Sequence, residues 1–310
     1  MCTDCNGKEA VFMRRYSGER LCGRCFCTSL EMKTRRTIAK YKMFDPTDKI
    51  MVAVSGGKDS LTLLHIIKKI EQAFPDTTLR ALTVDEGIGG YRDEALRMAA
   101  RNCQKLGVTH VVTSFKEIYG YELDDLVNLV QRRGKKGLTP CSYCGVLRRK
   151  ALNIAARASK ATKLATAHSL DDETQTLLLN IIHGNPFRIA RSNPVLKGIH
   201  PNFIQRVKPF CNIPEKEIAL YAHLKRIEFQ TIPCPYAQAA LREDIRRILN
   251  RTEEKHAGTK FTIFKSFERI RLALENVSKE GKLNTCKICG EPTTANLCKA
   301  CLLLEDLNLL

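Results

Sequence analysis

The stretch KIMVAVSGGKDSLTLLHII, Lys49–Ile67, decides what the middle of this 310-residue chain can be. It joins a short apolar run, through two glycines and a lysine, to a longer segment with apolar residues at helical spacing. When a strand leads directly into a helix, free backbone N–H groups and the positive end of the helix face the turn between them. Gly56 and Gly57 let the backbone approach an anion closely. The stretch therefore predicts a phosphate-binding turn.

The turn lacks the spacing of the common nucleotide-triphosphatase loop. That loop needs GxxxxGK[ST], whereas SGGKDS at 55–60 is shorter and carries an acid after the lysine. Ser55 and Ser60 can donate hydroxyl hydrogen bonds, and Lys58 offers a point charge. An ordinary strand–helix turn with a serine cap is the alternative. The stretch resembles the PP-loop of the N-type ATP pyrophosphatases, and this resemblance implies adenylation of a substrate oxygen with release of pyrophosphate.

Apolar runs alternate with helical patterns through the middle of the chain. Strands are expected at 49–54, 79–87, 109–115 and 162–169, and helices at 59–74, 91–107, 144–159, 170–184, 214–227 and 240–256. Such an alternation implies βαβ units and a parallel sheet with helices on both faces. The predicted fold class is α/β, with a doubly wound core flanked by a cysteine module at each end.

Polar side chains follow two of these strands. LTVDEGIGG places Val84 and Asp85 at the carboxyl end of the second strand, where ligands gather in open α/β sheets. TAHSLDDET places Ala167, Asp171 and Asp172 after the fourth strand. Two adjacent acids at a helix start can bind Mg²⁺, although plain helix capping is the competing interpretation. Their combination with SGGKDS favours catalysis.

Two CxxC pairs stand at each end of the chain. They are Cys2, Cys5, Cys22 and Cys25 at the start, and Cys286, Cys289, Cys298 and Cys301 at the end. Four thiolates suit tetrahedral Zn²⁺, and such a closed site leaves no open position for catalysis. Each segment is too short to bury a core, so metal binding, worth about 10–16 kcal/mol, must supply much of its folding free energy. Two structural zinc ions are therefore predicted.

A further group of cysteines lies in the core. Cys141 and Cys144 form a close pair in TPCSYCG, and Cys234 is remote from them in TIPCPYA. Spacing leaves three interpretations open: an iron–sulfur site, a redox pair that carries a persulfide, or buried cysteines without chemistry. Arg148 and Arg149 lie about one turn after Cys144, where they could meet phosphates. Three cysteines without partners at metal-ligand spacing are expected to be small buried side chains: Cys27, Cys103 and Cys211.

The overall charge favours a polyanionic partner. The chain has 51 Lys and Arg residues against 33 Asp and Glu, which gives a formal charge of +18. Nucleic acid is the favoured polyanionic partner. KKG at 135–137, RIARS at 188–192 and REDIRR at 242–247 are possible phosphate contacts, or solvated faces. The sequence shows neither a membrane-span pattern nor a signal-peptide pattern, so a cytoplasmic location is expected, where thiols stay reduced and bind metal.

The motifs occur in one order: CxxC…CxxC, SGGKDS, CSYCG, AHSLDDE, PCPYA and CxxC…CxxC. This order resembles the TtuA-like family, which includes the archaeal and eukaryotic cytoplasmic tRNA 2-thiolation proteins, and the resemblance covers essentially the whole chain. It implies a sulfurtransferase that adenylates the C2 oxygen of a tRNA uridine, with the wobble position favoured, and replaces that oxygen with sulfur. The implied division is an N-terminal zinc finger at 1–30, a PP-loop core with a helical extension at 31–250, a linker helix at 251–280 and a C-terminal zinc finger at 281–310.

The resemblance also assigns roles to residues. Cys141, Cys144 and Cys234 would ligate a [4Fe–4S] cluster that holds the sulfur, Asp59 and Asp172 would be catalytic or Mg²⁺-associated acids, and Arg148 would stabilise charge. ATP would be bound by Ala53, Val54, Ser55, Gly56, Gly57, Lys58, Asp59, Ser60, Val84, Ala167 and Asp172. The implied partners are tRNA, a sulfur donor (free sulfide or a thiocarboxylated ubiquitin-like protein) and a second copy of the chain.

Two kinds of competitor remain. The nearer ones are other PP-loop tRNA enzymes, such as a cytidine 2-thiolase or a lysidine synthetase, against which the paired terminal zinc modules argue. The other kind is a non-enzymatic zinc-ribbon RNA-binding protein. It would explain the charge and the zinc but would give SGGKDS and the core cysteines no role. Pyrophosphate release that depends on tRNA separates the two kinds.

Overall fold

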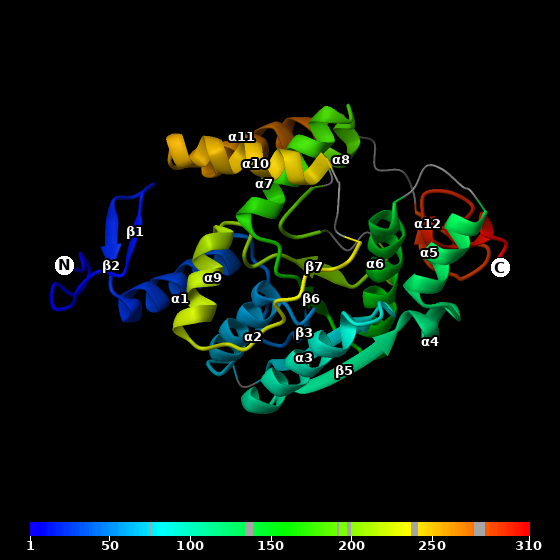
Figure 1. Ribbon diagram of the computed structural model, residues 1–310, viewed down its shortest axis with the longest axis horizontal. Helices are drawn as coiled ribbons and strands as arrows, with labels where there is room; N and C mark the ends of the chain where they lie inside the picture. Colours follow the sequence, from blue (N-terminus) through cyan, green and yellow to red (C-terminus); the bar gives the residue numbers. More distant parts are fainter. Residues whose placement is uncertain (75, 134–138, 191, 197–199, 237–240, 276–282) are drawn as a thin grey trace.

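The computed structural model describes residues 1–310 except 75, 134–138, 191, 197–199, 237–240 and 276–282. Its centre is a parallel five-stranded sheet in the order β5-β4-β3-β6-β7 (Figure 1). The strands are β3 (Lys49–Ala53), β4 (Thr78–Asp85), β5 (Thr109–Ser114), β6 (Lys163–Ala165) and β7 (Gln205–Val207). Along the chain, β4 and β5 add to one side of β3. The chain then crosses back, and β6 and β7 add to the other side of β3. Ligands of open α/β sheets bind where the strand order reverses, here at the carboxyl ends of β3 and β6.

Helices cover both faces of the sheet, because neighbouring residues of a strand point to opposite sides. Ile50 and Val52 of β3 belong to an apolar cluster built with α1 (Gly23–Lys40), α2 (Lys58–Glu71) and α9 (Glu215–Leu224). Met51 belongs to a second cluster on the other face. Its helices are α5 (Leu123–Arg132), α6 (Pro140–Ala158) and α12 (Lys299–Glu305). The predicted doubly wound α/β core is confirmed.

The remaining helices are α3 (Arg92–Leu106), α4 (Phe115–Tyr119), α7 (Leu170–Ile182), α8 (Pro186–Ala190), α10 (Leu241–Lys255) and α11 (Thr259–Glu275). The fourth predicted strand is shorter than expected, because its pairing with β3 ends at Ala165. Ser169 then caps α7 by accepting a hydrogen bond from the backbone N–H of Asp172. Strand β7 and four helices of the body were not predicted: α1, α4, α5 and α8. No helix of the described residues is both long and apolar enough to cross a membrane.

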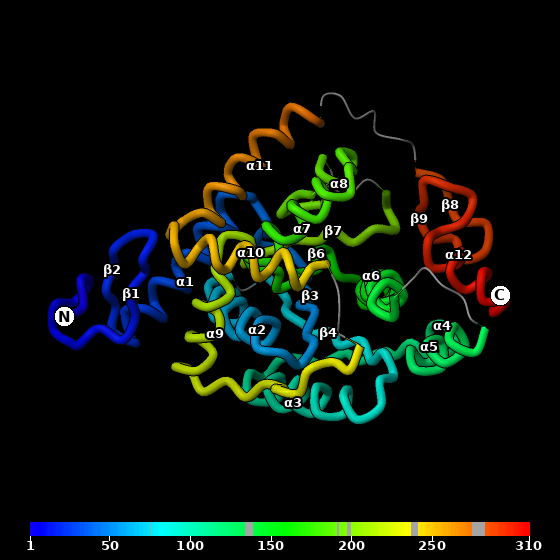
Figure 2. The backbone as a smooth tube through the Cα atoms, turned by 45° about the horizontal axis from the view of Figure 1, so that its top comes forward, coloured from blue at the N-terminus to red at the C-terminus, as the bar shows by residue number. Residues whose placement is uncertain are grey.

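The two cysteine modules lie at opposite ends of the long axis (Figures 1 and 2). The N-terminal one contains the hairpin β1 (Phe12–Arg14) and β2 (Glu19–Leu21), and the C-terminal one pairs β8 (Asn284–Thr285) with β9 (Pro292–Thr293). Arg14 is fully buried and forms an ion pair of 2.8 Å with Glu217 of α9, which fastens the first module to the body. Leu303 and Leu304 of α12 are buried against the second apolar cluster, so the apolar C-terminal tail packs on the body.

Two helices run across predicted domain boundaries. Helix α1 continues through residue 30, and α10 continues through residue 250. The division into 1–30, 31–250, 251–280 and 281–310 stays a prediction. The three cysteines without metal-ligand spacing are buried, as expected: Cys27, Cys103 and Cys211.

Candidate nucleotide and cysteine site

The SGGKDS turn is closed by its own serines. The backbone N–H of Ser55 donates to Ser60 Oγ over 3.0 Å, and Ser60 Oγ donates to the carbonyl of Gly57 over 3.0 Å. Gly56 has φ +87°, and a Cβ there would lie 2.5 Å from the carbonyl oxygen of Ala95 on α3. Only glycine fits this position, because both the backbone conformation and the close approach to α3 exclude a side chain. The turn thus places the start of α2 at the edge of the sheet.

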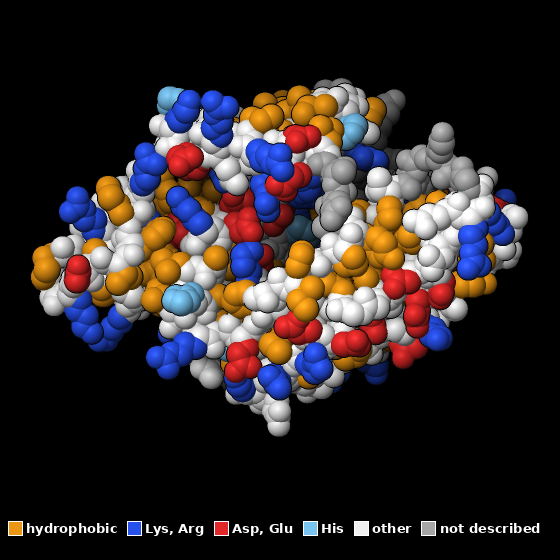
Figure 3. Space-filling view, in the orientation of Figure 1, with side chains coloured by type: hydrophobic (Ala, Val, Ile, Leu, Met, Phe, Trp, Pro, Cys, Tyr) orange, Lys and Arg blue, Asp and Glu red, His pale blue; other side chains and the backbone are white. Residues whose placement is uncertain are grey.

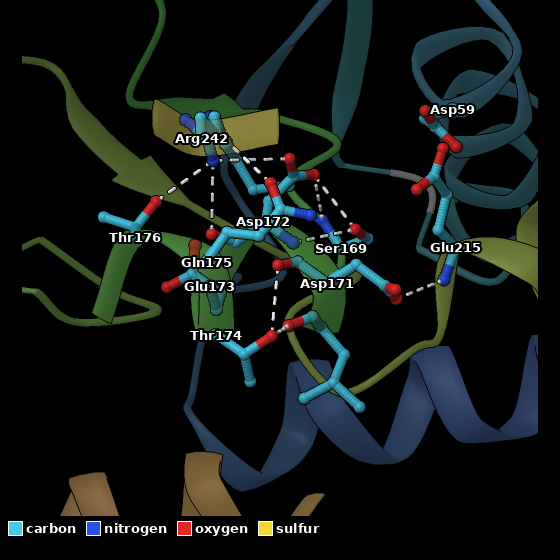
Figure 4. A network of polar contacts seen from close by, with 12 residues as sticks. Asp59, Ser169, Asp171, Asp172, Glu173, Thr174, Gln175, Thr176, Glu215 and Arg242 are labelled. Carbon is cyan, nitrogen blue, oxygen red and sulfur yellow. Dashed lines mark hydrogen bonds and ion pairs between the residues drawn. The ribbon is translucent and has the colours of Figure 1, made fainter. Parts of the chain in front are cut away.

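One cation and two carboxylates meet beside the turn. Lys58 Nζ lies 3.0 Å from Asp59 Oδ2 and 2.6 Å from Glu215 Oε1. Burial raises the pKa of Asp59 to about 6; Lys58 acts against this shift, while Glu215 and Asp172 add to it. Figure 4 shows the carboxylates of Asp59 and Glu215 turned toward each other. Asp59 Oδ1 is buried and has no hydrogen-bond partner among the described residues, so it is an acceptor available to a metal ion or a substrate proton.

The two acids after β6 have different surroundings. Asp171 is buried, pairs with Lys260 of α11, and accepts a hydrogen bond of 2.7 Å from the backbone N–H of Glu215. These contacts give Asp171 a structural role. Asp172 Oδ2 accepts two hydrogen bonds from Ser169, and Oδ1 lies 3.6 Å from Arg242 Nη2 (Figure 4). Asp172 thus completes the capping box of α7, and its side chain is still 38% exposed and open to a ligand.

The other residues predicted to line the nucleotide site share the carboxyl edge of the sheet. Ala53 ends β3, Val54 follows it and donates to the carbonyl of Leu82, Val84 lies near the end of β4, and Ala167 follows β6. In Figure 3 this face of the molecule is hollowed below α10, with acidic side chains inside the hollow and lysine and arginine side chains around it. The predicted ATP-binding residues therefore come together at one edge, where the strand order reverses.

A buried ion pair that the sequence analysis missed supports this edge. Glu86, just after β4, is 2% exposed, and its Oε2 lies 2.8 Å from Arg92 Nε. Arg92 also donates to the carbonyls of Ser55 and Val84, over 3.1 and 2.7 Å. It thereby joins the phosphate turn to the neighbouring strand. Glu86 follows Asp85 in the quoted LTVDEG, but nothing local distinguishes a buried acid from an exposed one there.

The paired core cysteines lie on the first turns of α6. Thr139 caps this helix by accepting from the backbone N–H of Ser142. Cys144 is 7% exposed, and burial raises the pKa of its thiol to about 11, against the effect of Arg148. Arg148 Nη2 donates to Cys144 Sγ over 3.0 Å. A cation is thus already positioned to stabilise this sulfur as a thiolate.

The remote cysteine comes to the same place. Cys141 Sγ donates to the carbonyl of Tyr236 over 3.1 Å, and the Tyr236 hydroxyl donates to Asp124 Oδ1 over 2.7 Å. The first contact holds the segment that carries Cys234 against the start of α6, and the second holds it against α5. Burial, and then the nearby Cys234, raise the pKa of the Cys141 thiol. The three cysteines are neighbours that could serve as ligands of a common group.

The sulfurs of this trio are spaced more widely than those of a single-ion site. Among the described residues, cysteine groups with all sulfurs within 4.8 Å of one another occur at the chain ends, and the trio is not one of them. A cluster of several irons lies between its thiolates and separates them more than one zinc ion does. A donor set of thiolates with Arg148 beside it therefore fits an iron–sulfur cluster better than zinc.

The terminal modules have the spacing of zinc sites. Cys5 Sγ and Cys22 Sγ lie 3.9 Å apart, and Cys289 Sγ and Cys298 Sγ lie 3.7 Å apart. Four sulfurs about 2.3 Å from one tetrahedral ion are roughly 3.8 Å from each other. The backbone N–H of Cys298 also donates to Cys286 Sγ over 3.2 Å, as expected for a thiolate acceptor. Both groups of four cysteines fit Zn²⁺.

The three basic motifs differ in their surroundings. KKG at 135–137 lies outside the described residues, as does Arg191 within RIARS. In REDIRR, Arg246 and Arg247 pair with Glu243, whereas Arg242 reaches Gln175 and Asp172 at the hollow. Arg242 therefore belongs to the wall of the site.

A parallel sheet with this glycine turn where its strand order reverses defines a PP-loop ATP-binding protein. The model of the PP-loop domain family matches residues 28–253. Cytoplasmic tRNA 2-thiolation protein 1 of Chlamydomonas reinhardtii is 36% identical over 99% of this chain and 85% of its own length. The tRNA 2-thiolation protein NcsA of Haloferax volcanii is 35% identical over 99% of both chains. This chain belongs to the family of tRNA 2-thiolation proteins, as the order of its motifs indicated.

A solved structure agrees over nearly the full length. The U34-tRNA thiolase NcsA from Methanococcus maripaludis, determined with its [4Fe-4S] cluster, superposes with a TM-score of 0.85 at 33% identity. The match covers 99% of this chain and 96% of that one. The shared architecture thus includes the two terminal modules as well as the PP-loop core.

Proposed function

We propose that this chain is an ATP-dependent sulfurtransferase that replaces the C2 oxygen of a tRNA uridine, at the wobble position, with sulfur. The observation that carries this proposal is the side-by-side arrangement of a PP-loop and three neighbouring cysteines, joined through Arg92, Glu86 and Arg148. The relatives support it, because those over the whole chain are named for tRNA 2-thiolation and the Methanococcus maripaludis protein for U34.

The first step is adenylation. The C2 oxygen of the uridine attacks the α-phosphorus of ATP, and pyrophosphate leaves. The turn at 55–60 would bind the leaving phosphates through its backbone N–H groups and Lys58, with Ala53, Val54, Val84 and Ala167 on the adenosine side. Asp59 and Asp172 are the acids that would hold Mg²⁺ at the phosphates. A carbonyl oxygen is a poor leaving group, and its adenylate is a good one.

The second step is substitution. A sulfur nucleophile adds at C2, and AMP departs with the original oxygen. A [4Fe–4S] cluster on Cys141, Cys144 and Cys234 supplies, when bound, an iron position for the sulfur to be transferred. Arg148 stabilises negative charge on Cys144, and the buried Glu86 keeps its guanidinium in place. We further propose that the sulfur donor is free sulfide or a thiocarboxylated ubiquitin-like protein, and that the chain acts as a cytoplasmic homodimer with two structural zinc ions.

Nucleoside mass spectrometry tests this proposal. Anaerobically purified protein, incubated with tRNA, ATP and sulfide, is expected to produce 2-thiouridine and to release pyrophosphate only when tRNA is present. A 2-thiocytidine product would indicate a cytidine thiolase instead. Binding of tRNA without any pyrophosphate release would indicate a non-enzymatic RNA-binding protein.

A further inference from the structure

An open groove lies away from the phosphate turn, between α1, the loop before α11 and α11 itself. Its volume is about 1070 Å³. One side of α1 lines the groove. It carries residues at the spacing i, i+3, i+4 and i+7, which share one side of a helix: Lys33, Arg36, Thr37 and Lys40. Lys265 comes from α11, and the aromatic rings of Tyr16 and Phe261 close one end at a centroid distance of 4.7 Å. The N-terminal hairpin, α1 and α11 build this groove together.

The groove is electropositive. Among the described residues that line it, four are lysine or arginine, one is histidine and none is acidic. Lys40 has a carboxylate partner, Glu268 at 3.1 Å, just behind the wall. Lys33 lies 4.0 Å from Glu217, but that carboxylate is already paired with Arg14 at 2.8 Å. Glu253 also lies beside the groove, where its carboxylate accepts from the backbone N–H groups of Gly258 and Lys260. These acids leave other cations of the groove without a carboxylate partner among the described residues.

Two of these cations are free to bind a ligand. Arg36 and Lys265 are exposed, and neither forms an ion pair or a side-chain hydrogen bond with any residue that the structure describes. They come from different helices that line the groove, one on α1 and one on α11. Cations that share one concave surface repel one another and attract an anion.

We infer that this groove binds the sugar-phosphate backbone of the tRNA substrate, outside the site where the base reacts. The inference rests on the proposed function. The volume far exceeds that of a single phosphate, and cations spaced by about one helical turn, ~5 Å, suit a chain of phosphates. The Tyr16 hydroxyl accepts a hydrogen bond of 2.5 Å from Lys33 and bonds Glu217, so it fixes Lys33 and does not read a base. The contact is with the backbone, which positions an RNA without reading its sequence.

The groove is rigidly connected to the nucleotide site. Lys260, at the start of α11 and next to Phe261 in the groove, is buried and pairs with Asp171 of α7. Asp171 accepts from the backbone N–H of Glu215, whose carboxylate lies 2.6 Å from Lys58 of the phosphate turn. An RNA held in the groove is therefore held at a fixed place relative to that turn.

Charge reversal tests the inference. The variant is Arg36→Glu with Lys265→Glu, and the matched control is Lys49→Glu with Arg97→Glu. Both control residues are exposed, and neither side chain forms an ion pair or a hydrogen bond within the part of the chain that the structure describes; Lys49 starts β3 at the opposite edge of the sheet, and Arg97 is on α3. Affinity for unmodified tRNA is measured by fluorescence anisotropy at several salt concentrations, with ATP binding, zinc content and thermal melting alongside.

We expect the groove variant to bind tRNA about tenfold or more weakly, with a slope of log affinity against log salt reduced by about two, while ATP binding and melting stay as in the control. Arg36→Lys with Lys265→Arg should restore the affinity, because the charge is kept. Equal affinity and slope in the groove and control variants would overturn the inference. If the groove variant bound tRNA normally, and its thiolation were slower with a protein sulfur donor but not with free sulfide, the groove would bind that donor protein and not tRNA. This result would also overturn the inference. Wild-type protein that binds no tRNA would refute the proposed function itself.

Discussion

The Nη2 atom of Arg148 lies 3.0 Å from the sulfur of Cys144. Both residues are on α6, and Cys144 precedes Arg148 by about one helical turn. The same guanidinium places its Nε 2.5 Å from Glu86 Oε1. The other oxygen of Glu86 faces Arg92, which bonds the carbonyl of Ser55 in the phosphate turn. A row of charged groups therefore runs from the nucleotide half of the site to its cysteine half. It fixes the distance between the two, which a reaction in two steps on one base requires.

Replacement of Glu86 by glutamine is expected to destabilise the fold strongly. The change removes a buried negative charge between two guanidiniums, and breaking such a pair costs about 3–5 kcal/mol because a charge is left uncompensated. Denaturant unfolding of the apoprotein measures the loss. Glu228→Gln is the control, since Glu228 is 48% exposed and pairs with Lys105 at the surface, where solvent screens the ion pair and its loss changes stability little. Equal losses in the two variants would contradict the prediction.

Asp59→Asn is expected to stabilise the protein at neutral pH while it impairs the reaction. Burial, opposed by Lys58, raises the pKa of Asp59 to about 6 from 3.8, so the folded state holds this proton more tightly than the unfolded state. The carboxylate then lowers stability as pH rises from about 4 to about 6, and the full penalty persists above that range. The melting temperature of the variant should therefore match wild type near pH 4 and exceed it near pH 7.5.

Function should change in the opposite direction. Pyrophosphate release by the Asp59→Asn variant is expected to fall at least about 100-fold, a magnitude typical for loss of a group that contacts the reacting phosphates, with tRNA affinity nearly unchanged. Equal losses of ATP use and tRNA binding would argue for a general structural role. A melting difference between wild type and variant that does not grow with pH would argue against the raised pKa.

The parts of the site that depend on neighbours in sequence could be predicted. The SGGKDS turn is defined by a strand, two glycines and a helix, all within Lys49–Ile67, and the structure shows them as expected. Each CxxC pair likewise carries its metal geometry locally. The length of the strand after residue 162 could not be predicted, because the apolar pattern continues to Ala167 whereas the pairing with β3 ends at Ala165.

Features that depend on tertiary contacts could not be predicted. Glu86 and Arg148 come from different elements, and their pairing follows only from the packing of α6 on the sheet. The cations of the groove likewise come from α1 and α11, which are remote in sequence. Helix α1 was missed because its buried face includes threonines such as Thr34 and Thr37, whose hydroxyls bond backbone carbonyls within the helix, so apolar periodicity is weak there.

Loss of a single core thiol is expected to separate the two steps. Cys234→Ala, purified without air, should retain tRNA-dependent pyrophosphate release but produce less than about 1% of the wild-type 2-thiouridine, because its thiolate takes part in sulfur delivery and not in ATP binding. The iron content of the variant should fall together with its yield of 2-thiouridine. Cys103→Ala is the control, since Cys103 is a buried cysteine of the other apolar cluster and has no partner at metal-ligand spacing. Full thiolation by the Cys234 variant would contradict the assignment of the trio to the cluster.

Removal of one zinc at a time should distinguish the two terminal modules. Cys5→Ser and Cys298→Ser are each expected to reduce bound zinc from about two ions per chain to about one, because a tetrahedral site with three thiolates holds the ion poorly. Their further effects should differ. Helix α12 of the C-terminal module packs on α6, and Lys150 of α6 lies 3.5 Å from Cys301 Sγ. The N-terminal module is fastened to α9 instead, through Arg14 and Glu217.

Helix α6 carries Cys141 and Cys144, so the C-terminal variant should lose iron along with its zinc, whereas the N-terminal variant should keep its iron. Elemental analysis of anaerobically purified protein measures both metals in one sample. The N-terminal variant should instead bind tRNA more weakly, because Tyr16 of its hairpin fixes Lys33 in the groove on α1. Equal iron loss in both variants would mean that the modules stabilise the whole fold and not the separate halves that they contact.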